Sequence, residues 1–291
     1  MHTSFEDKTI WITGASSGIG EALAMLLAMS GARLVLSGRD TNALACVAGK
    51  CADFSTSKKV SVESFDLSAG TDFSKIVEQV LCRTGGVDIL INNAGVGQRA
   101  SALSCDPSVV RRIMEVNFFG SVFLTQAILP SMIDRGSGRI VVVSSVLGKF
   151  HMPGRSAYSA SKHALRGYFD TLRAELYGSG VEITVVYPGW IATRISQNAL
   201  TADGTAYSRA FGKASRKMSA EACASRIVAA MSSGAGEAAM GGVEIFGGWF
   251  RTLFPKLYDR SMREKAKAFV YTRTKNTPDS QAEDFGVSGV K

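Results

Sequence analysis

Cysteine and histidine are scarce in this chain, and the few present do not cluster. Its 291 residues include five cysteines and three histidines. The cysteines form no CxxC pair and no zinc-like group, which is typical of scattered reduced thiols in a cytosolic protein. The histidines do not combine with acidic residues into a ligand set. We therefore expect no catalytic metal.

Long apolar runs are also missing, and acidic residues are outnumbered. No uninterrupted run approaches the ~20 apolar residues of a membrane-spanning helix. The first residues, MHTSFEDKTIWITG, lead directly into a strand pattern without the basic start and apolar core of a secretory signal, so we expect a cytoplasmic protein. The net charge of +8 alone would permit nucleic-acid binding. However, the first 240 residues hold no compact basic run with interleaved aromatics, and we expect no nucleic-acid partner.

Strand and helix patterns alternate along the chain. With 46% hydrophobic and 20% charged residues, the chain can build one large α/β domain or two smaller ones. Nearly all the strand segments are apolar, as expected for parallel strands that are covered on both faces. The pattern predicts an α/β fold with a doubly wound parallel sheet of about seven strands and helices on both faces. The predicted strands are 9–13, 33–38, 59–67, 87–95, 139–145, 181–189 and 241–247; the predicted helices are 21–31, 42–52, 73–85, 107–134, 156–177 and 219–234.

A glycine-rich turn, TGASSGIG, lies between the first strand and the first helix. It spans residues 13–20, with glycines in the order G-x-x-x-G-x-G. Such a turn lets the backbone approach a pyrophosphate, and the helix N-terminus supplies free N–H groups and partial positive charge. A merely structural tight turn is the alternative. Its place at the start of an α/β domain favours phosphate binding.

The segment YSASK places a phenol and an ammonium one helical turn apart. Tyr158 and Lys162 are four residues apart, so a helix presents both on one face. They could be ordinary surface residues. Alternatively, the ammonium could lower the phenol pKa from about 10 and make it an acid–base group. The predicted fold favours the second interpretation, because Ser145 at the end of the fifth strand can face the same cleft.

Taken together, these motifs resemble the short-chain dehydrogenase/reductase family over about residues 8–248. The motifs stand in family order: TGASSGIG, DL at 66–67, NNAG at 92–95, Asn117, Ser145, Tyr158-x-x-x-Lys162, and PG at 188–189 followed by Thr193. The sequences around Ser145 and Tyr158 are similar to those of the steroid- and retinoid-type branch of the family. The resemblance implies a single Rossmann-type domain, a dinucleotide cofactor, and a homodimer or homotetramer.

The resemblance also implies roles for individual residues. Tyr158 would exchange a proton with the substrate oxygen, Ser145 would hydrogen-bond that oxygen, and Lys162 would bind the nicotinamide ribose and lower the phenol pKa. Asn117 would hold a backbone kink and a water that relays protons to Lys162. The residues implied in cofactor binding are Gly14, Ser16, Ser17, Gly18, Ile19, Gly20, Arg39, Asp66, Leu67, Asn93, Ala94, Gly95, Tyr158, Lys162, Pro188, Gly189 and Thr193.

The end of the second strand favours NADP(H) over NAD(H). An acid that binds the ribose 2′-OH in NAD enzymes would fall near Gly38, and Arg39 follows it instead. Arg39 suits a 2′-phosphate. Asp40 complicates this interpretation, but it is better explained as the residue that initiates the next helix.

The substrate is less well defined than the cofactor. We expect residues 193–218 to cover the substrate and residues 150–154 to form another wall. These mixed apolar surfaces favour a bulky hydrophobic ketone or secondary alcohol, which makes an NADP(H)-dependent ketone/alcohol oxidoreductase the predicted function. The alternative is a non-catalytic dinucleotide sensor or scaffold on the same fold. Because Tyr158, Lys162, Ser145 and Asn117 are all present, the enzyme is favoured.

The C-terminal region carries a basic, apolar extension. Six large apolar residues recur at helical spacing between 250 and 262, with Pro255 marking a break or a new helix start. Three alternatives are open: a helix packed on its own domain, a lid or subunit contact, and a helix on an anionic membrane, which we rank third. We predict a domain over residues 1–248, an amphipathic extension over 249–274 and a disordered tail over 275–291.

Overall fold

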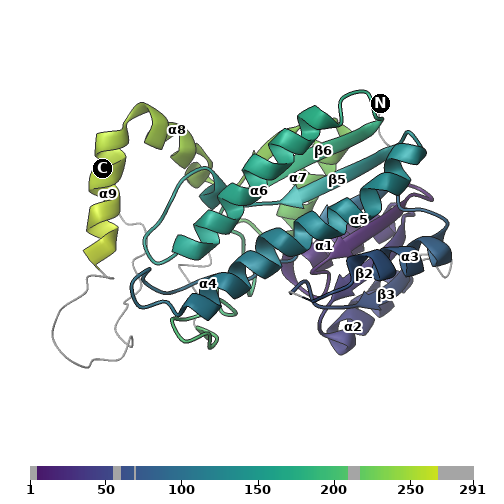
Figure 1. Cartoon of the computed structure of the whole chain (residues 1–291), viewed down its shortest axis with the longest axis horizontal. Coiled ribbons are helices and arrows are strands. Elements are labelled where there is room, and N and C mark those ends of the chain that lie inside the picture. The colour runs from purple at the N-terminus through teal and green to yellow at the C-terminus, as the bar shows by residue number, and fades with distance from the viewer. Residues whose placement is uncertain (1–4, 55–59, 69, 209–216, 268–291) are drawn as a thin grey trace.

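A seven-stranded, fully parallel sheet forms the centre of the protein (Figure 1). The computed structural model describes residues 5–54, 60–68, 70–208 and 217–267. The strand order is β3-β2-β1-β4-β5-β6-β7, so the direction of winding reverses between β1 and β4. This confirms the predicted doubly wound fold. The strands are β1 (Thr9–Thr13), β2 (Arg33–Gly38), β3 (Val60–Ser64), β4 (Ile89–Asn92), β5 (Gly138–Val143), β6 (Val181–Pro188) and β7 (Glu237–Met240).

Helices cover both faces of the sheet because successive strand residues point in opposite directions. On β1, Ile10 and Ile12 join a core cluster with α1, α2 and α7, whereas Trp11 between them joins a cluster with α3, α5 and α6. Both cores are almost fully closed to solvent. The helices that cover the sheet are α1 (Gly18–Met29), α2 (Thr41–Ala52), α3 (Phe73–Thr84), α5 (Gly120–Asp134), α6 (Ser156–Glu175) and α7 (Ala220–Ser232). A further helix, α4 (Pro107–Met114), packs in a smaller cluster beside the sheet.

The helix that carries the YSASK segment is amphipathic, as predicted. Leu165 and Phe169 are 1% and 0% exposed, so α6 is held against the sheet by one apolar face. Burial of such side chains stabilises by roughly 2–3 kcal/mol each. This face fixes the rotation of α6 and therefore the direction of the polar residues in its first turns.

One continuous helical run spans 107–134, as predicted, but its hydrogen-bonding pattern changes in the middle. A π-helical segment, η1 (Glu115–Phe119), joins α4 to α5. The run is long and apolar enough to cross a membrane by length and composition. Half of its apolar window is buried inside the protein, and Leu124 and Ile128 are fully buried in the sheet-packed core, which is the behaviour of a core helix.

The prediction of a last strand over 241–247 is wrong. The last strand is β7, four residues earlier, and it pairs with Val185–Pro188 of β6. Residues 243–246 instead form a 3-10 helix, η4 (Val243–Phe246). Glu244 explains this: its Oε1 accepts hydrogen bonds from the backbone N–H groups of Trp190 (2.9 Å) and Gly242 (3.0 Å), which turns the chain away from the sheet.

Two helices follow η4 and lie at one end of the molecule (Figure 1). These are α8 (Gly247–Leu253) and α9 (Pro255–Ala266). Pro255 starts α9, where a missing N–H costs nothing. The domain boundaries remain a prediction, and the predicted tail over 275–291 lies outside the described residues.

Candidate active site

A cavity of about 550 Å³ lies at the carboxyl ends of the strands. It brings together most of the residues singled out in the sequence. Two are not on its wall: Gly20 packs behind the glycine-rich turn, and Asn117 is completely buried beside the cleft. The predicted residues that line the cavity are Gly14, Ser16, Ser17, Gly18, Ile19, Arg39, Asp66, Leu67, Asn93, Ala94, Gly95, Ser145, Tyr158, Lys162, Pro188, Gly189 and Thr193.

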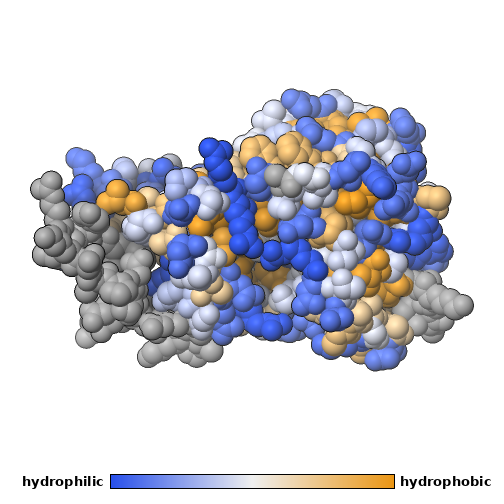
Figure 2. Space-filling model, turned by 60° about the horizontal axis from the view of Figure 1, so that its bottom comes forward, coloured by the Kyte–Doolittle hydropathy of each residue, from blue (hydrophilic) through white to orange (hydrophobic). Residues whose placement is uncertain are grey.

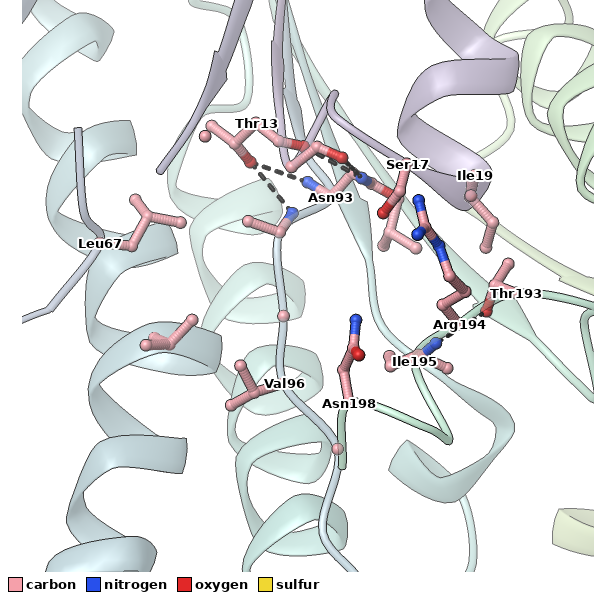
Figure 3. A pocket seen from close by; sticks show the side chains of 18 of the residues that line it. Thr13, Ser17, Ile19, Leu67, Asn93, Val96, Thr193, Arg194, Ile195 and Asn198 are labelled. Carbon is pink, nitrogen blue, oxygen red and sulfur yellow. Dashed lines mark hydrogen bonds between the residues drawn. The ribbon is translucent and has the colours of Figure 1, made fainter. Parts of the chain in front are cut away.

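The glycine-rich turn is packed too tightly for side chains. A Cβ at Gly14 would lie 2.7 Å from Cα of Ala94, and a Cβ at Gly20 would lie 2.2 Å from the carbonyl oxygen of Gly14. Figure 3 shows how Thr13 and Asn93 lock the turn: Thr13 Oγ1 accepts from Asn93 N–H (3.0 Å), and Asn93 Nδ2 donates to Thr13 O (3.0 Å). The turn is thus fixed, with its backbone facing the cavity.

The N-terminus of α1 opens into this cavity without a side-chain cap. Ser17 occupies the N-cap position but its hydroxyl accepts no hydrogen bond from the helix. Figure 3 shows the Arg194 guanidinium directed toward Ser17. No sequence motif marks Arg194 as a site residue, because its approach to residue 17 depends on the path of the chain after β6. Free N–H groups and a guanidinium together form a place for a phosphate anion.

Arg39 and Asp66 mark the far end of the cavity, after β2 and β3. The Arg39 Nη1 lies 3.9 Å from Asp66 Oδ2, and both side chains are about half exposed. Asp40 accepts from Ala43 N–H and caps α2, as predicted. A Cβ at Gly38 would make only ordinary contacts, the nearest at 3.7 Å from Leu44 and Ser16. The end of β2 therefore presents the Arg39 guanidinium to the cavity and leaves open space at position 38.

Ser145, Tyr158 and Lys162 meet on the opposite side of the cavity. Ser145 is 7% exposed and caps the 3-10 helix η2 (Val146–Gly148), accepting from Leu147 N–H at 3.2 Å. Lys162 is 3% exposed, and its Nζ donates to Val143 O at 2.9 Å. The Nζ also lies 5.9 Å from the centre of the Tyr158 ring. The structure therefore places the hydroxyl, the phenol and the ammonium at one site.

The expectation that Lys162 lowers the phenol pKa stays a prediction. Burial in the cleft raises the pKa of Tyr158, while a hydrogen bond with Ser145 and the charge of Arg155 oppose the rise. The Lys162 ammonium is bonded to Val143 O, which directs it toward the sheet. Burial also lowers the pKa of Lys162 from 10.5 to about 8.

The low pKa of Lys162 predicts a pH-dependent stability. Below about pH 8 the folded and unfolded chains are both protonated, and burial of the charge destabilises the fold in full. Between about pH 8 and 10.5 the folded chain loses the proton first, so its stability rises with pH. As pH rises over this range, we expect the free energy of unfolding of the wild type to increase relative to that of Lys162→Met. Urea unfolding of both proteins at several pH values measures this difference. Lys75→Met, an exposed lysine on α3, is the control; an equal pH response in both pairs would contradict the prediction.

Asn117 lies in the π-helical segment, and both polar atoms of its side chain form hydrogen bonds. Its Oδ1 accepts from Val96 N–H at 2.7 Å, and its Nδ2 donates to Val96 O and Ser161 Oγ, both at 3.0 Å. The side chain therefore ties the long helix to the loop after β4 and to α6. The predicted backbone kink is present as η1; the predicted water relay stays a prediction.

Gln98 and Arg155 hold the backbone at Tyr158 in place through hydrogen bonds, and neither residue was predicted from the sequence. Gln98 is fully buried, and its Oε1 accepts from Tyr158 N–H at 3.2 Å. Its backbone oxygen accepts from the Arg155 guanidinium, which is itself 7% exposed. Neither residue belongs to a local motif, and 60 positions separate Gln98 from Tyr158. Together they fix the first turn of α6, which has no side-chain cap of its own.

The two predicted substrate walls have different outcomes. Ile195, Asn198 and Leu200 line the cavity, in agreement with a substrate-facing segment after Thr193; residues 209–216 lie outside the described residues. Residues 150–154 are absent from the cavity wall described here. Phe150 packs against Tyr258 of α9 (ring centroids 6.3 Å apart), whereas Met152 packs in the same cluster as Tyr158, so the second wall stays a prediction.

Comparison with known proteins agrees with this geometry. The family model described as "short chain dehydrogenase" matches residues 8–204. The chain belongs to the short-chain dehydrogenase/reductase family. Among curated members of this family, Dehydrogenase/reductase SDR family member 7B of zebrafish (Danio rerio) is 42% identical over 269 residues, which is 91% of this chain and 87% of that protein.

Two solved structures of short-chain dehydrogenases share the fold over nearly their whole length. A Streptomyces avermitilis enzyme is 28% identical with a TM-score of 0.74, covering 90% of this chain and 99% of that one. A Burkholderia cenocepacia enzyme, solved in complex with NADP, is 26% identical with a TM-score of 0.72, covering 89% of this chain and 99% of that one.

Proposed function

We propose that this chain is an NADP(H)-dependent oxidoreductase that interconverts a ketone and a secondary alcohol. The observation that carries the proposal is one cavity with a phosphate-binding turn at one side and Ser145, Tyr158 and Lys162 at the other. This arrangement is what hydride transfer with coupled proton transfer requires. Membership of an oxidoreductase family supports the same reaction class.

The cavity residues fit a dinucleotide phosphate. The uncapped N-terminus of α1, the close-packed turn at Gly14 and the Arg194 guanidinium would hold the pyrophosphate. Arg39 would bind the ribose 2′-phosphate, because no acid stands at position 38 to repel it. The NADP complex of the Burkholderia cenocepacia relative supports this choice of cofactor.

The chemistry divides between the cofactor and three side chains. The hydride that reduces the carbonyl carbon would come from NADPH when it is bound. Tyr158 donates its phenolic proton to the carbonyl oxygen, and in the reverse direction it accepts that proton from the alcohol. Ser145 hydrogen-bonds the same oxygen and stabilises the charge that develops on it. Lys162 would bind the nicotinamide ribose, and its positive charge would favour the phenolate that proton transfer leaves behind.

The proposed substrate is bulky and hydrophobic. Val96, Ile195 and Leu200 contribute apolar side chains to the cavity wall. Arg112 also lines the cavity, so the substrate surface is mixed rather than purely apolar. A non-catalytic dinucleotide sensor is the weaker candidate, since it would need neither the phenol nor its support by Gln98.

A substrate screen tests this proposal. We expect purified protein to oxidise NADPH with some members of a ketone series that runs from short aliphatics to steroids, and to prefer the larger ones. The decrease in NADPH absorbance measures this. Cofactor binding without turnover across the whole series, in both directions, would favour the sensor instead. Cytoplasmic location and oligomeric state stay predictions.

A further inference from the structure

Large apolar side chains are concentrated on the outer surface of η4, α8 and the start of α9. Seven of the fifteen strongly exposed large apolar residues in the described chain lie between positions 243 and 257. Trp249 is 70% exposed and Leu253, one helical turn later, is 63% exposed. We call this set the C-terminal patch: Val243, Phe246, Trp249, Phe250, Leu253, Phe254 and Leu257.

The C-terminal patch is the outer surface of a segment whose inner surface already packs against the domain. Tyr258 and Met262 on α9 are buried in a cluster with Val146, Leu147 and Phe150. The Tyr258 hydroxyl donates to the backbone oxygen of His151, which fastens α9 to the loop after Ser145. The inner contacts therefore leave the C-terminal patch facing outward.

Basic side chains surround the patch. Arg251 lies within it on α8, and Lys256, Arg260 and Arg263 are exposed on α9. Figure 2 shows apolar and hydrophilic side chains next to each other at this end of the molecule (left).

The acids of this segment offset half of that charge and leave a positive net charge. Glu244 accepts two backbone hydrogen bonds, and Glu264 pairs with Lys267 at 2.5 Å. Between residues 243 and 267 there are six basic residues and three acids, so the segment carries 6 − 3 = +3. The surface is thus apolar at its centre and positive at its margin.

We propose that the C-terminal patch docks on an anionic phospholipid bilayer. A contiguous exposed apolar patch indicates an interaction site, and aromatic and aliphatic side chains bordered by Lys and Arg are the composition that lies in a lipid interface. A second copy of the chain fits less well, because a two-fold contact would bring two surfaces of +3 together. The sequence alone ranks the membrane below packing on the same domain and a lid or subunit contact, whereas the exposure of the patch and its basic border favour the membrane.

Docking would bring the active-site cleft close to the lipid. The inner side of α9 packs in one cluster with the residues that follow Ser145 and with the Tyr158 side chain. An apolar substrate could then pass from the bilayer to the cleft over a short path. The docking proposal itself rests on the patch and its charges, and it stands whether or not the proposed reaction is correct.

Vesicle co-sedimentation of the full chain tests the proposal. We expect the protein to pellet with phosphatidylcholine vesicles that contain phosphatidylserine, to pellet less with phosphatidylcholine alone, and to be released by high salt. Trp249→Ser/Leu253→Ser/Leu257→Ser should abolish the binding. Lys256→Gln/Arg260→Gln/Arg263→Gln should weaken it roughly 100-fold, at about a factor of five for each of the three cations near an anionic surface.

The matched control replaces three exposed apolar residues elsewhere on the surface. Met29→Ser/Ile133→Ser/Tyr177→Ser removes side chains at the ends of α1, α5 and α6 and should bind vesicles like the wild type. Thermal unfolding and NADPH titration establish that each variant is folded. If the Ser triple variant fails to fold, Trp249 fluorescence replaces it: anionic vesicles should shift the wild-type emission to the blue, and Trp249→Phe should remove the shift.

Three results would overturn the proposal. The first is wild-type protein that stays in the supernatant with phosphatidylserine vesicles. The second is binding that the control variant loses as much as the patch variant does. The third is a wild-type oligomer, seen by light scattering, that the patch variant dissociates while vesicles recruit neither protein; the patch would then be a subunit contact.

Discussion

Tyr158→Phe should reduce turnover by about 10²–10⁴-fold while NADPH affinity stays within a factor of two or three of wild type. The substitution removes one oxygen atom and keeps the ring, so the packing of α6 and the hydrogen bond from its backbone N–H to Gln98 remain. Only the proton donor is lost. Single-turnover absorbance measures the hydride transfer step, and fluorescence titration measures cofactor binding.

Tyr168→Phe is the matched control for this experiment. Tyr168 lies ten residues later on the same helix, where its hydroxyl accepts from Gln126 at 3.1 Å near the surface. Its loss should leave turnover essentially unchanged. Tyr158→Phe with wild-type turnover would remove the phenol from the mechanism, and equal losses in both variants would point to a general weakening of α6.

The second large effect concerns cofactor choice at the end of β2. Arg39→Ala should weaken NADPH roughly 10–100-fold, since a charge-assisted bond to phosphate is worth about 1.5–3 kcal/mol, and it should hardly change NADH. Adding Gly38→Asp should raise NADH affinity as well, because the new carboxylate can accept from the ribose 2′-OH. The open space at position 38, with its nearest contacts at 3.7 Å, accommodates this side chain without backbone strain.

Arg33→Ala provides the comparison within the same strand. Arg33 begins β2, is exposed and pairs with Asp7 at 3.4 Å, far from the cavity. Titration of each variant with both cofactors should show no change of preference for Arg33→Ala. A wild-type preference for NADH, or equal losses of the two cofactors in Arg39→Ala, would contradict the assignment.

Local signals made much of this fold predictable. The apolar strand runs and the glycine-rich turn each specify their structure within a few residues, so the sheet, the turn and the position of Tyr158 and Lys162 on one helix face could be inferred. The last strand could not. Residues 243–246 have a strand-like pattern, but the Glu244 carboxylate bonds backbone N–H groups that are up to 54 positions away and overrides it.

The residues that hold the candidate site in place could not be predicted from the sequence either. Gln98, Arg155 and Arg194 act through contacts between loops, and no spacing rule connects them to Tyr158 or Ser17. The apolar periodicity after Gly248 was visible, yet only packing distinguishes Tyr258, which is buried, from Leu257 beside it, which is exposed. Sequence patterns predict that a residue is apolar, whereas the tertiary structure decides what it contacts.

Backbone hydrogen bonds join the two ends of the segment between β6 and α7, so this segment can change in length. Met218 N–H donates to Trp190 O (3.0 Å) and Ala192 N–H donates to Met218 O (2.8 Å), so both ends of the intervening segment are pinned together. The entropy of closing a loop rises slowly with its length, at about 0.6 kcal/mol for each doubling. Insertions or deletions inside this loop can therefore reshape the cavity wall around Ile195 and Leu200, while the strands and the glycine-rich turn keep their positions. Substrate range in this protein can evolve by changes in loop length, separately from the machinery that holds the dinucleotide.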